Sequence, residues 1–318
     1  MSDHLTDAGR SGDTPSRAIA ANAATGLIWL HAALILFSTA ALVTFLANPT
    51  PEVQAWLARE PNATVYRIAW KFSGPTYVVA GFLAAVAHAM ARLGVRPRVI
   101  LMFLAVSLLA LLSELLGTYT GFPFGGYSYT PMLGYRILGL VPFPIAISWT
   151  CILYCSLAMC GRLLPARDDL STRLRWSAVG ALILTGWDVA MDPAMVKTFH
   201  WTWHQPGPFY GMPYTNWLGW LGTGFVLSWV MLRFVPPSLF AARISTTRLP
   251  LVLYALNGIM PIAICVRYGM FWAAGLGTLA MGVPLLMSVR RGSRPASDEP
   301  AERRAKGWPG SEPAAMTP

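Results

Sequence analysis

Three acidic residues lie within or at the ends of long apolar segments, where a charged side chain is costly to bury. Glu114 falls near the end of an apolar run at about 99–117, and Asp188 and Asp192 fall near the end of another at about 176–191. Residues four positions apart share one face of a helix, so Asp188 and Asp192 are expected to project together. Burial favours the protonated form of a carboxyl group, and a neighbouring carboxylate favours it further in one member of a pair. These three residues are therefore candidates for acid catalysis in a dry site.

Purely structural roles remain open for each of these acids. Asp192 precedes Pro193, which is expected to mark the point where the helix gives way to a loop, and its side chain could cap the following turn. Glu114 could instead pair with Arg136 or Lys197. Because such roles would have to apply to all three residues at once, a shared site is the favoured interpretation.

Aromatic residues gather in the segments that follow the same apolar runs. A belt of Tyr and Trp at the membrane interface accounts for part of this set. A belt does not require Gly125-Gly126 or Pro206-Gly207-Pro208, which impose fixed turns and allow close backbone approach. An apolar slot with aromatic faces and a few acids suits a long hydrophobic substrate and a cationic transition state. The candidate binding residues are Phe124, Tyr127, Tyr129, Trp187, Tyr210, Tyr214, Asn216 and Trp220, with His204 as a proton relay or an interfacial contact.

The composition identifies the kind of fold that must position these residues. The chain has 318 residues, is 55% hydrophobic and 12% charged, and has a mean hydropathy of +0.49. This is too little polar surface for a soluble domain of this size, so we expect an all-α integral membrane bundle. Runs near the ~20 residues needed to cross a bilayer predict about eight transmembrane helices. They lie at about 27–47, 74–91, 99–117, 143–161, 176–191, 216–234, 249–266 and 270–289.

Two stretches that connect these segments repeat each other at an offset of 85 residues. Residues 123–135 align with residues 208–220, and seven of the thirteen columns are identical. The shared pattern, Pro-Phe-x-Gly-x-x-Tyr-Thr-x-x-Leu-Gly-aromatic, predicts an internal duplication with the site between its halves. Two similar Pro/Gly turns without common origin remain the alternative.

The basic residues orient the predicted bundle, because Lys and Arg near helix ends stay on the cytoplasmic side. Of the 24 basic residues, all but six fall in the tails or in alternate loops; the six are Arg59, Arg67, Lys71, Arg136, Lys197 and Arg267. We therefore expect both termini in the cytoplasm of a bacterial cell and the repeated stretches at the opposite face. The asymmetry also accounts for the net charge of +10 through attraction to anionic lipid, so nucleic acid is not an expected partner. The predicted organisation is a disordered tail at 1–24, a transmembrane helical domain at 25–290 and a disordered tail at 291–318.

Metal and cofactor chemistry find little support in the sequence. His200 and His204 flank an aromatic stretch, but membrane di-iron enzymes need a larger set of imidazoles, so no metal is expected. A phosphate-binding loop, a dinucleotide fingerprint and a Cys-x-x-Cys pair are also missing from the sequence. We expect the chemistry to proceed without a nucleotide, haem or flavin.

Four motifs contain most of the candidate residues. They are Glu114-Leu-Leu-Gly-Thr-Tyr-Thr-Gly121, Phe124-Gly-Gly-Tyr127, Trp187-Asp188-x-x-Met-Asp192-Pro193 and Tyr210-Gly-x-Pro-x-x-Asn216-x-x-Gly-Trp220. Together they resemble the CruF-type family of polytopic carotenoid biosynthesis proteins, which contains carotenoid 1',2'-hydratases and bisanhydrobacterioruberin hydratases. The resemblance extends over roughly residues 70–290.

The resemblance implies an enzyme that adds water to the terminal C1',2' double bond of an acyclic carotenoid ψ end group and gives a tertiary alcohol. The implied partners are a lipophilic carotenoid, such as lycopene or a γ-carotene-like compound, together with water and membrane lipid. The residues themselves suggest a matching mechanism, in which Asp188 or Asp192 donates the proton and the other positions and deprotonates the water. Trp187, Tyr127 and Tyr214 would face the cation, and Glu114 is the competing acid.

Two other functions remain open at this stage. An intramembrane prenyltransferase is also an all-helical bundle with acidic signatures, and Asp188-x-x-x-Asp192 resembles half of one. Such an enzyme binds a diphosphate through Mg²⁺ and needs a second acidic cluster, which the sequence lacks. A non-enzymatic carotenoid-binding or transport protein would explain the repeat without any chemistry.

Overall fold

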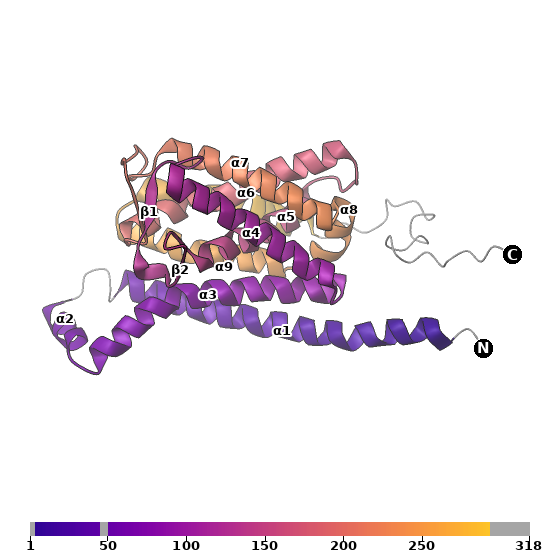
Figure 1. The fold of residues 1–318 in the computed structure, drawn as a ribbon, viewed down its shortest axis with the longest axis horizontal. Helices are drawn as coiled ribbons and strands as arrows, with labels where there is room; N and C mark the ends of the chain where they lie inside the picture. The colour runs from indigo at the N-terminus through magenta and orange to yellow at the C-terminus, as the bar shows by residue number, and fades with distance from the viewer. Residues whose placement is uncertain (1–3, 45–49, 293–318) are drawn as a thin grey trace.

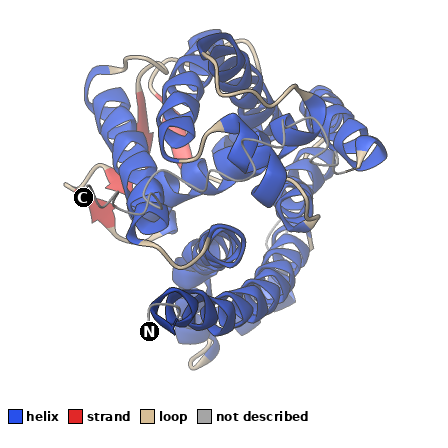
Figure 2. Ribbon diagram, turned by 90° about the vertical axis from the view of Figure 1, so that its right-hand side faces the viewer, coloured by secondary structure: helices blue, strands red, loops and turns tan. Residues whose placement is uncertain are grey.

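The computed structural model describes residues 4–44 and 50–292, which form a bundle of long helices. The α-helices are α1 (His4–Val43), α2 (Pro51–Ala58), α3 (Asn62–Leu93), α4 (Pro97–Thr120), α5 (Phe143–Leu163), α6 (Leu170–Lys197), α7 (Tyr214–Phe234), α8 (Pro237–Leu239), α9 (Leu249–Arg267) and α10 (Phe271–Arg291). Two further helical turns are η1 (Pro131–Leu133), a 3₁₀-helix, and η2 (Phe240–Ile244), a π-helix. Figure 1 shows α1 and α3 side by side along one edge of the bundle, and Figure 2 looks nearly along the helix axes.

The predicted all-α membrane bundle is confirmed. Within the described residues, seven helices are long and apolar enough to cross a membrane, and the number is eight if α7 and the segment Pro237–Ile244, which are bent by 83°, count as one span. Each of the eight predicted apolar runs lies largely within one of these helices. The face of α4 turned away from the bundle exposes a row of apolar side chains, namely Ile100, Leu101, Leu104, Leu108, Leu112 and Leu116. Exposed aliphatic side chains of this kind suit contact with lipid.

Two boundaries differ from those expected from the sequence. Helix α1 begins at His4, so residues 4–24 are helical although composition predicts a disordered tail there. The Ala-rich stretch before the first span favours helix and lets the spanning helix extend toward its N-terminus. Helix α6 continues through Pro193 to Lys197, whereas we expected it to end at Pro193. The predicted C-terminal tail lies outside the described residues beyond Gly292.

Short strands join two long loops at one end of the bundle, at the left of Figure 1. Strand β1 (Tyr127–Tyr129), which follows α4, pairs antiparallel with β4 (Trp201–Trp203), which follows α6. The backbone bond from Thr130 N to His200 O, 3.0 Å, extends this pairing. Strands β2 (Arg136–Ile137) and β3 (Val141–Pro142) form a small hairpin before α5. The loops that carry the two repeated stretches therefore lie at the same end of the molecule.

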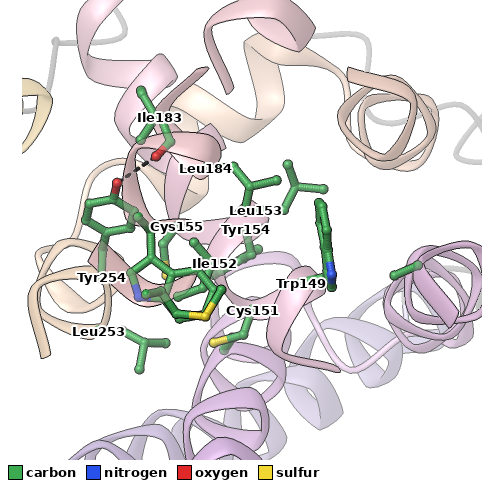
Figure 3. Packing of buried hydrophobic residues seen from close by; sticks show 14 of the residues in the cluster. Trp149, Cys151, Ile152, Leu153, Tyr154, Cys155, Ile183, Leu184, Leu253 and Tyr254 are labelled. Atoms are coloured by element: carbon green, nitrogen blue, oxygen red, sulfur yellow. Dashed lines mark hydrogen bonds between the residues drawn. The ribbon is translucent and has the colours of Figure 1, made fainter. Parts of the chain in front are cut away.

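The core is centred on α5, whose residues from Trp149 to Arg162 are all buried. A helix that is buried all round is expected at the centre of a bundle. Figure 3 shows part of this core, including Trp149 and the hydrogen bond of 2.7 Å that Tyr254 donates to the carbonyl of Ile183. The four cysteines are free and buried, as expected for residues that pack rather than react.

Candidate active site

Glu114 lies on the inner face of α4 and is only 4% exposed. Its Oε2 accepts hydrogen bonds from the hydroxyls of Tyr127 and of Tyr129, the latter at 2.8 Å. Its Oε1 accepts a bond of 2.8 Å from the indole Nε1 of Trp149. An indole nitrogen can only donate, and two phenols donate to the other oxygen, so this arrangement suits an ionised carboxylate.

The ion pairs considered for Glu114 are not formed. Arg136 donates instead to the carbonyl of Tyr129 at 3.1 Å, and Lys197 lies over the ring of Tyr268 at 5.2 Å. Burial, together with the adjacent charge of Glu114, raises the pKa values of the Tyr127 and Tyr129 hydroxyls well above their usual range, so both phenols remain hydrogen-bond donors.

Asp188 and Asp192 project from one face of α6, as their spacing predicts, and both are buried. The side-chain nitrogen of Asn216, at the start of α7, donates to Asp188 Oδ2 at 2.9 Å and to Asp192 Oδ2 at 3.3 Å. Asp192 Oδ1 also accepts a bond of 3.1 Å from Trp203 Nε1. Asp188 Oδ1 has no hydrogen-bond partner among the described residues. The side chain of Asp192 is therefore directed to Trp203 and Asn216, and the capping role considered for it is not seen.

Aromatic rings surround the two acidic groups. Trp149 and Trp220 stack with their ring centroids 3.9 Å apart, and Trp187 meets Trp220 edge-on at 6.0 Å. The register of the loop sheet places Tyr127 opposite Trp203 and Tyr129 opposite Trp201. Residues directly opposite in an antiparallel pair contact each other, which is why this short sheet builds a continuous aromatic wall.

Two glycines allow the aromatic wall to approach the helices. Phe124 is buried between α4 and α7, and a Cβ added at Gly117 or at Gly219 would lie 2.6 Å from its ring. A larger residue at either position would displace Phe124. Gly219 belongs to one repeated stretch and Phe124 to the other, so the two stretches contact each other directly.

The acids and rings border one pocket, in which about 840 Å³ is not filled by atoms, including space that is open to the outside. Both Glu114 and Asp192 line it, and most of the other lining residues are apolar or aromatic. Among the described residues that line it, none is basic. The lining residues are Ile35, Tyr77, Val78, Glu114, Phe124, Tyr127, Tyr129, Leu133, Pro144, Ile145, Ser148, Trp149, Trp187, Met191, Asp192, Met195, Trp201, Trp203, Asn216, Trp220, Asn257, Met260 and Pro261.

Most of the residues singled out in the sequence meet at this pocket. Glu114, Phe124, Tyr127, Tyr129, Trp187, Asp192, Asn216 and Trp220 line it, and Asp188 is linked to it through Asn216. Three candidates lie elsewhere. Tyr214 is 57% exposed, the hydroxyl of Tyr210 accepts a bond from Trp272 N at 3.3 Å, and His204 contacts Ser128 Oγ at 2.8 Å in the loop sheet.

Several pocket residues were not among the candidates. Trp149 lies within an apolar run, and nothing in its neighbourhood along the chain marks it as a partner of Glu114. Trp201 and Trp203 are two of the aromatic residues that follow the apolar run of α6, and their alternation would place both on one face of a strand. Tyr77 and Asn257 come from helices that carry no motif.

The repeated stretches do not share one conformation. Tyr127–Tyr129 form strand β1, whereas the aligned residues 212–214 lead into the first turn of α7. Tyr129 is consequently buried against Glu114, while its aligned counterpart Tyr214 is exposed. The proximity of the two stretches agrees with a site between them, and their common origin stays a prediction.

Comparison with known proteins places these features in a family. The profile of the carotenoid biosynthesis protein family matches residues 73–284, a range that contains the whole of α4 to α9. A protein from Haloarcula japonica named bisanhydrobacterioruberin hydratase is 33% identical over 113 residues, which cover 36% of this chain and 38% of that protein. No solved structure matches the chain significantly. Since the profile covers well over half of its length, the chain belongs to the carotenoid biosynthesis protein family.

Proposed function

We propose that this protein hydrates the terminal C1',2' double bond of an acyclic carotenoid ψ end group and releases a tertiary alcohol. The observation that carries the proposal is the position of Asp192 and Glu114 on the wall of one aromatic pocket. The family supplies the class of substrate, and the name of the Haloarcula japonica relative supports hydration as the reaction.

Asp192 is the acid in this proposal. Its carboxyl proton moves to C2', the less substituted carbon, and the π electrons of the double bond form the new C–H bond. The positive charge is left on the tertiary carbon C1', where the oxygen of a water molecule forms the C–O bond. That water then returns a proton to the Asp192 carboxylate, so the acid is regenerated and one water is added. Asp188 does not line the pocket. Its role in this proposal is to position Asn216, whose side-chain nitrogen donates a hydrogen bond to each aspartate.

Glu114 has a different role in this proposal. All three of its hydrogen-bond partners donate to it, so the carboxylate is held in its ionised form and does not supply a proton. A fixed carboxylate at the pocket wall stabilises the positive charge that develops on the substrate. The faces of Trp187, Trp220 and Tyr127 add cation–π stabilisation in a site with little water.

Single amide variants test the roles of the acids. Asp192→Asn, Asp188→Asn and Glu114→Gln are expressed in a lycopene-producing host, and the pigments are separated and weighed by mass spectrometry. Asp192→Asn should reduce hydrated product by roughly 100-fold or more, as expected for loss of a general acid, and the other two should reduce it less. Asp168→Asn, which changes an exposed loop acid that bonds Ser238, is the matched control and should keep the parental yield. Parental yields from all three site variants would contradict the proposal.

The same pigments distinguish the other two functions. A prenyltransferase would add a prenyl mass, but the described lining of the pocket offers no basic residue for a diphosphate. A binding or transport protein would leave the mass of lycopene unchanged. A gain of one water is the outcome that hydration requires.

A further inference from the structure

The residues around the pocket differ in exposure according to the helix that carries them. Every lining residue from α6, α7 and α9 is buried. Four lining residues on α3 and α5 are partly exposed, namely Tyr77, Val78, Ile145 and Ser148. The lining is therefore least covered on the side formed by α3 and α5, which we call the gap.

The four residues of the gap belong to the candidate membrane spans of α3 and α5. The spanning part of α3 begins at Gly74 and that of α5 at Phe143, and both begin at the end of the bundle that holds the loop sheet. At a rise of 1.5 Å per residue, the four residues lie roughly 3–8 Å inside those ends. Farther along, His88 Nδ1 on α3 and the Tyr154 hydroxyl on α5 are 2.7 Å apart, so the same helices are joined below the gap.

The gap presents an apolar surface. Val78 and Ile145 are aliphatic, and the hydroxyl of Ser148 is occupied by a hydrogen bond of 2.8 Å to the carbonyl of Ile145. Trp203 is the other partly exposed lining residue, but it lies in the loop sheet outside the spanning helices and bonds Asp192. Trp203 therefore marks the side of the lining next to the loop sheet, whereas the gap lies between two helices that are long and apolar enough to span a membrane.

We propose that the gap between α3 and α5 is a lateral portal through which the polyene chain of the substrate runs from the pocket into the bilayer. The inference rests on the proposed function for the identity of the ligand. An extended acyclic carotenoid is comparable in length with the hydrocarbon core of a bilayer, about 30 Å, and its reacting double bond lies at one end, so the rest of the chain extends away from the reacting carbon atoms. The end group occupies the pocket, and Tyr77, Val78, Ile145 and Ser148 contact the chain that follows it.

Photocrosslinking tests where the chain runs. A benzophenone amino acid replaces Val78, Ile145, Met191 or Leu104 in four separate variants, and each purified protein is irradiated with lycopene in lipid nanodiscs. Met191 lines the pocket and reports the end group, and Leu104 on the exposed face of α4 reports non-specific contact. Adducts at Val78, Ile145 and Met191, at least about fivefold above Leu104, are the expected result, since the chain is held only in the pocket and its portal.

The outcomes separate the portal from the proposed function. Adducts at Met191 but not at Val78 or Ile145 would overturn the portal and leave carotenoid binding intact. If none of the three positions formed adducts, the carotenoid would not bind in the pocket, and both the portal and the proposed function would be overturned. Equal yields at Leu104 and at the portal positions would also overturn the portal.

Bulky substitutions give a functional test. Val78→Trp and Ile145→Trp should lower lycopene hydration in membranes by roughly tenfold, because added volume in a packed passage cannot be accommodated without displacement. On a short acyclic isoprenoid that carries the same end group, both variants should lose a clearly smaller fraction of their activity than on lycopene. Leu104→Trp should match the parent on both compounds. An equal loss of activity on the short compound would point to damage within the pocket and overturn the interpretation of the residues as a portal.

Discussion

Asp188 and Asp192 accept hydrogen bonds from the same atom, the side-chain nitrogen of Asn216, at 2.9 and 3.3 Å. An amide nitrogen carries two hydrogens, so one side chain can serve both carboxyl groups at once. The aspartates belong to α6 and the asparagine to α7, and this contact fixes the rotation of one helix against the other. Asn216 is 2% exposed, so water cannot easily replace its amide.

Replacement of Asn216 should therefore impair catalysis more than folding. Asn216→Leu removes both hydrogen bonds while keeping a similar volume, and we expect hydration to fall roughly 10- to 100-fold as Asp192 loses its position. Leu218→Ala, on the exposed side of the same helix, is the control and should keep parental activity. The measurement is hydrated product per amount of folded protein in membranes. Parental activity in Asn216→Leu would show that the bridge has no part in the reaction.

Glu114 should be important for stability as well as for the reaction. Glu114→Leu leaves the polar hydrogens of Tyr127, Tyr129 and Trp149 buried without an acceptor, and we expect a loss of about 3 kcal/mol in the free energy of unfolding. Glu114→Gln keeps an acceptor oxygen and should lose less. Melting temperatures of the purified proteins in detergent give the comparison, with Leu112→Ala on the exposed face of α4 as the control. If the leucine variant had the same melting temperature as the parent, the three hydrogen bonds would not contribute to stability.

The arrangement of the acids was predictable to the extent that it depends on local spacing. The four-residue interval between Asp188 and Asp192 defines a shared helix face whatever the tertiary structure. The apolar runs likewise define the helices, since a spanning segment must satisfy its backbone internally. The contact from Trp149 to Glu114 was not predictable, because it joins two helices through a residue that reads as ordinary core.

The assignment of Tyr214 shows a second limit of sequence reasoning. Tyr214 was expected to face the cation, but it begins a helix and is exposed, whereas Tyr129, with which it aligns, lies in a strand and is buried. Side chains repeat every two residues in a strand and every 3.6 residues in a helix, so aligned residues in a strand and in a helix need not face the same side of the molecule. Similarly, Pro193 was expected to end α6, but the helix continues, as tertiary packing in a membrane can tolerate a proline within a spanning helix.

His200 should make the loop sheet sensitive to acid. The ring is buried and its Nδ1 lies 2.8 Å from Thr198 Oγ1, while its backbone bonds Met195 and Thr130. Burial lowers the pKa of His200 to about 4, whereas an unfolded histidine titrates near 6.5. Between these values the unfolded state binds more protons than the folded state. The contribution of the neutral His200 ring to the free energy of unfolding is therefore fully present above pH 6.5 and is lost as the pH falls toward 4.

The measurement is the melting temperature of the purified protein between pH 7.5 and pH 4.5, for the parent and for His200→Asn. The parent should lose more stability over this range than the variant, because asparagine does not titrate and can still bond Thr198. An equal loss in both proteins would assign the acid sensitivity to other groups.

The distribution of basic residues makes a prediction about sidedness that labelling can test. The loop sheet should face away from the cytoplasm, and the bent segment at η2 should face the cytoplasm, since Lys and Arg collect near that end. Thr202 in β4 and Ala242 in η2 are both exposed, and the four native cysteines are buried, so single cysteines at these positions report each side. In intact cells with a permeable outer layer, a membrane-impermeant maleimide should label Thr202→Cys, and it should label Ala242→Cys only after the membrane is opened. The reverse pattern would place the loop sheet in the cytoplasm.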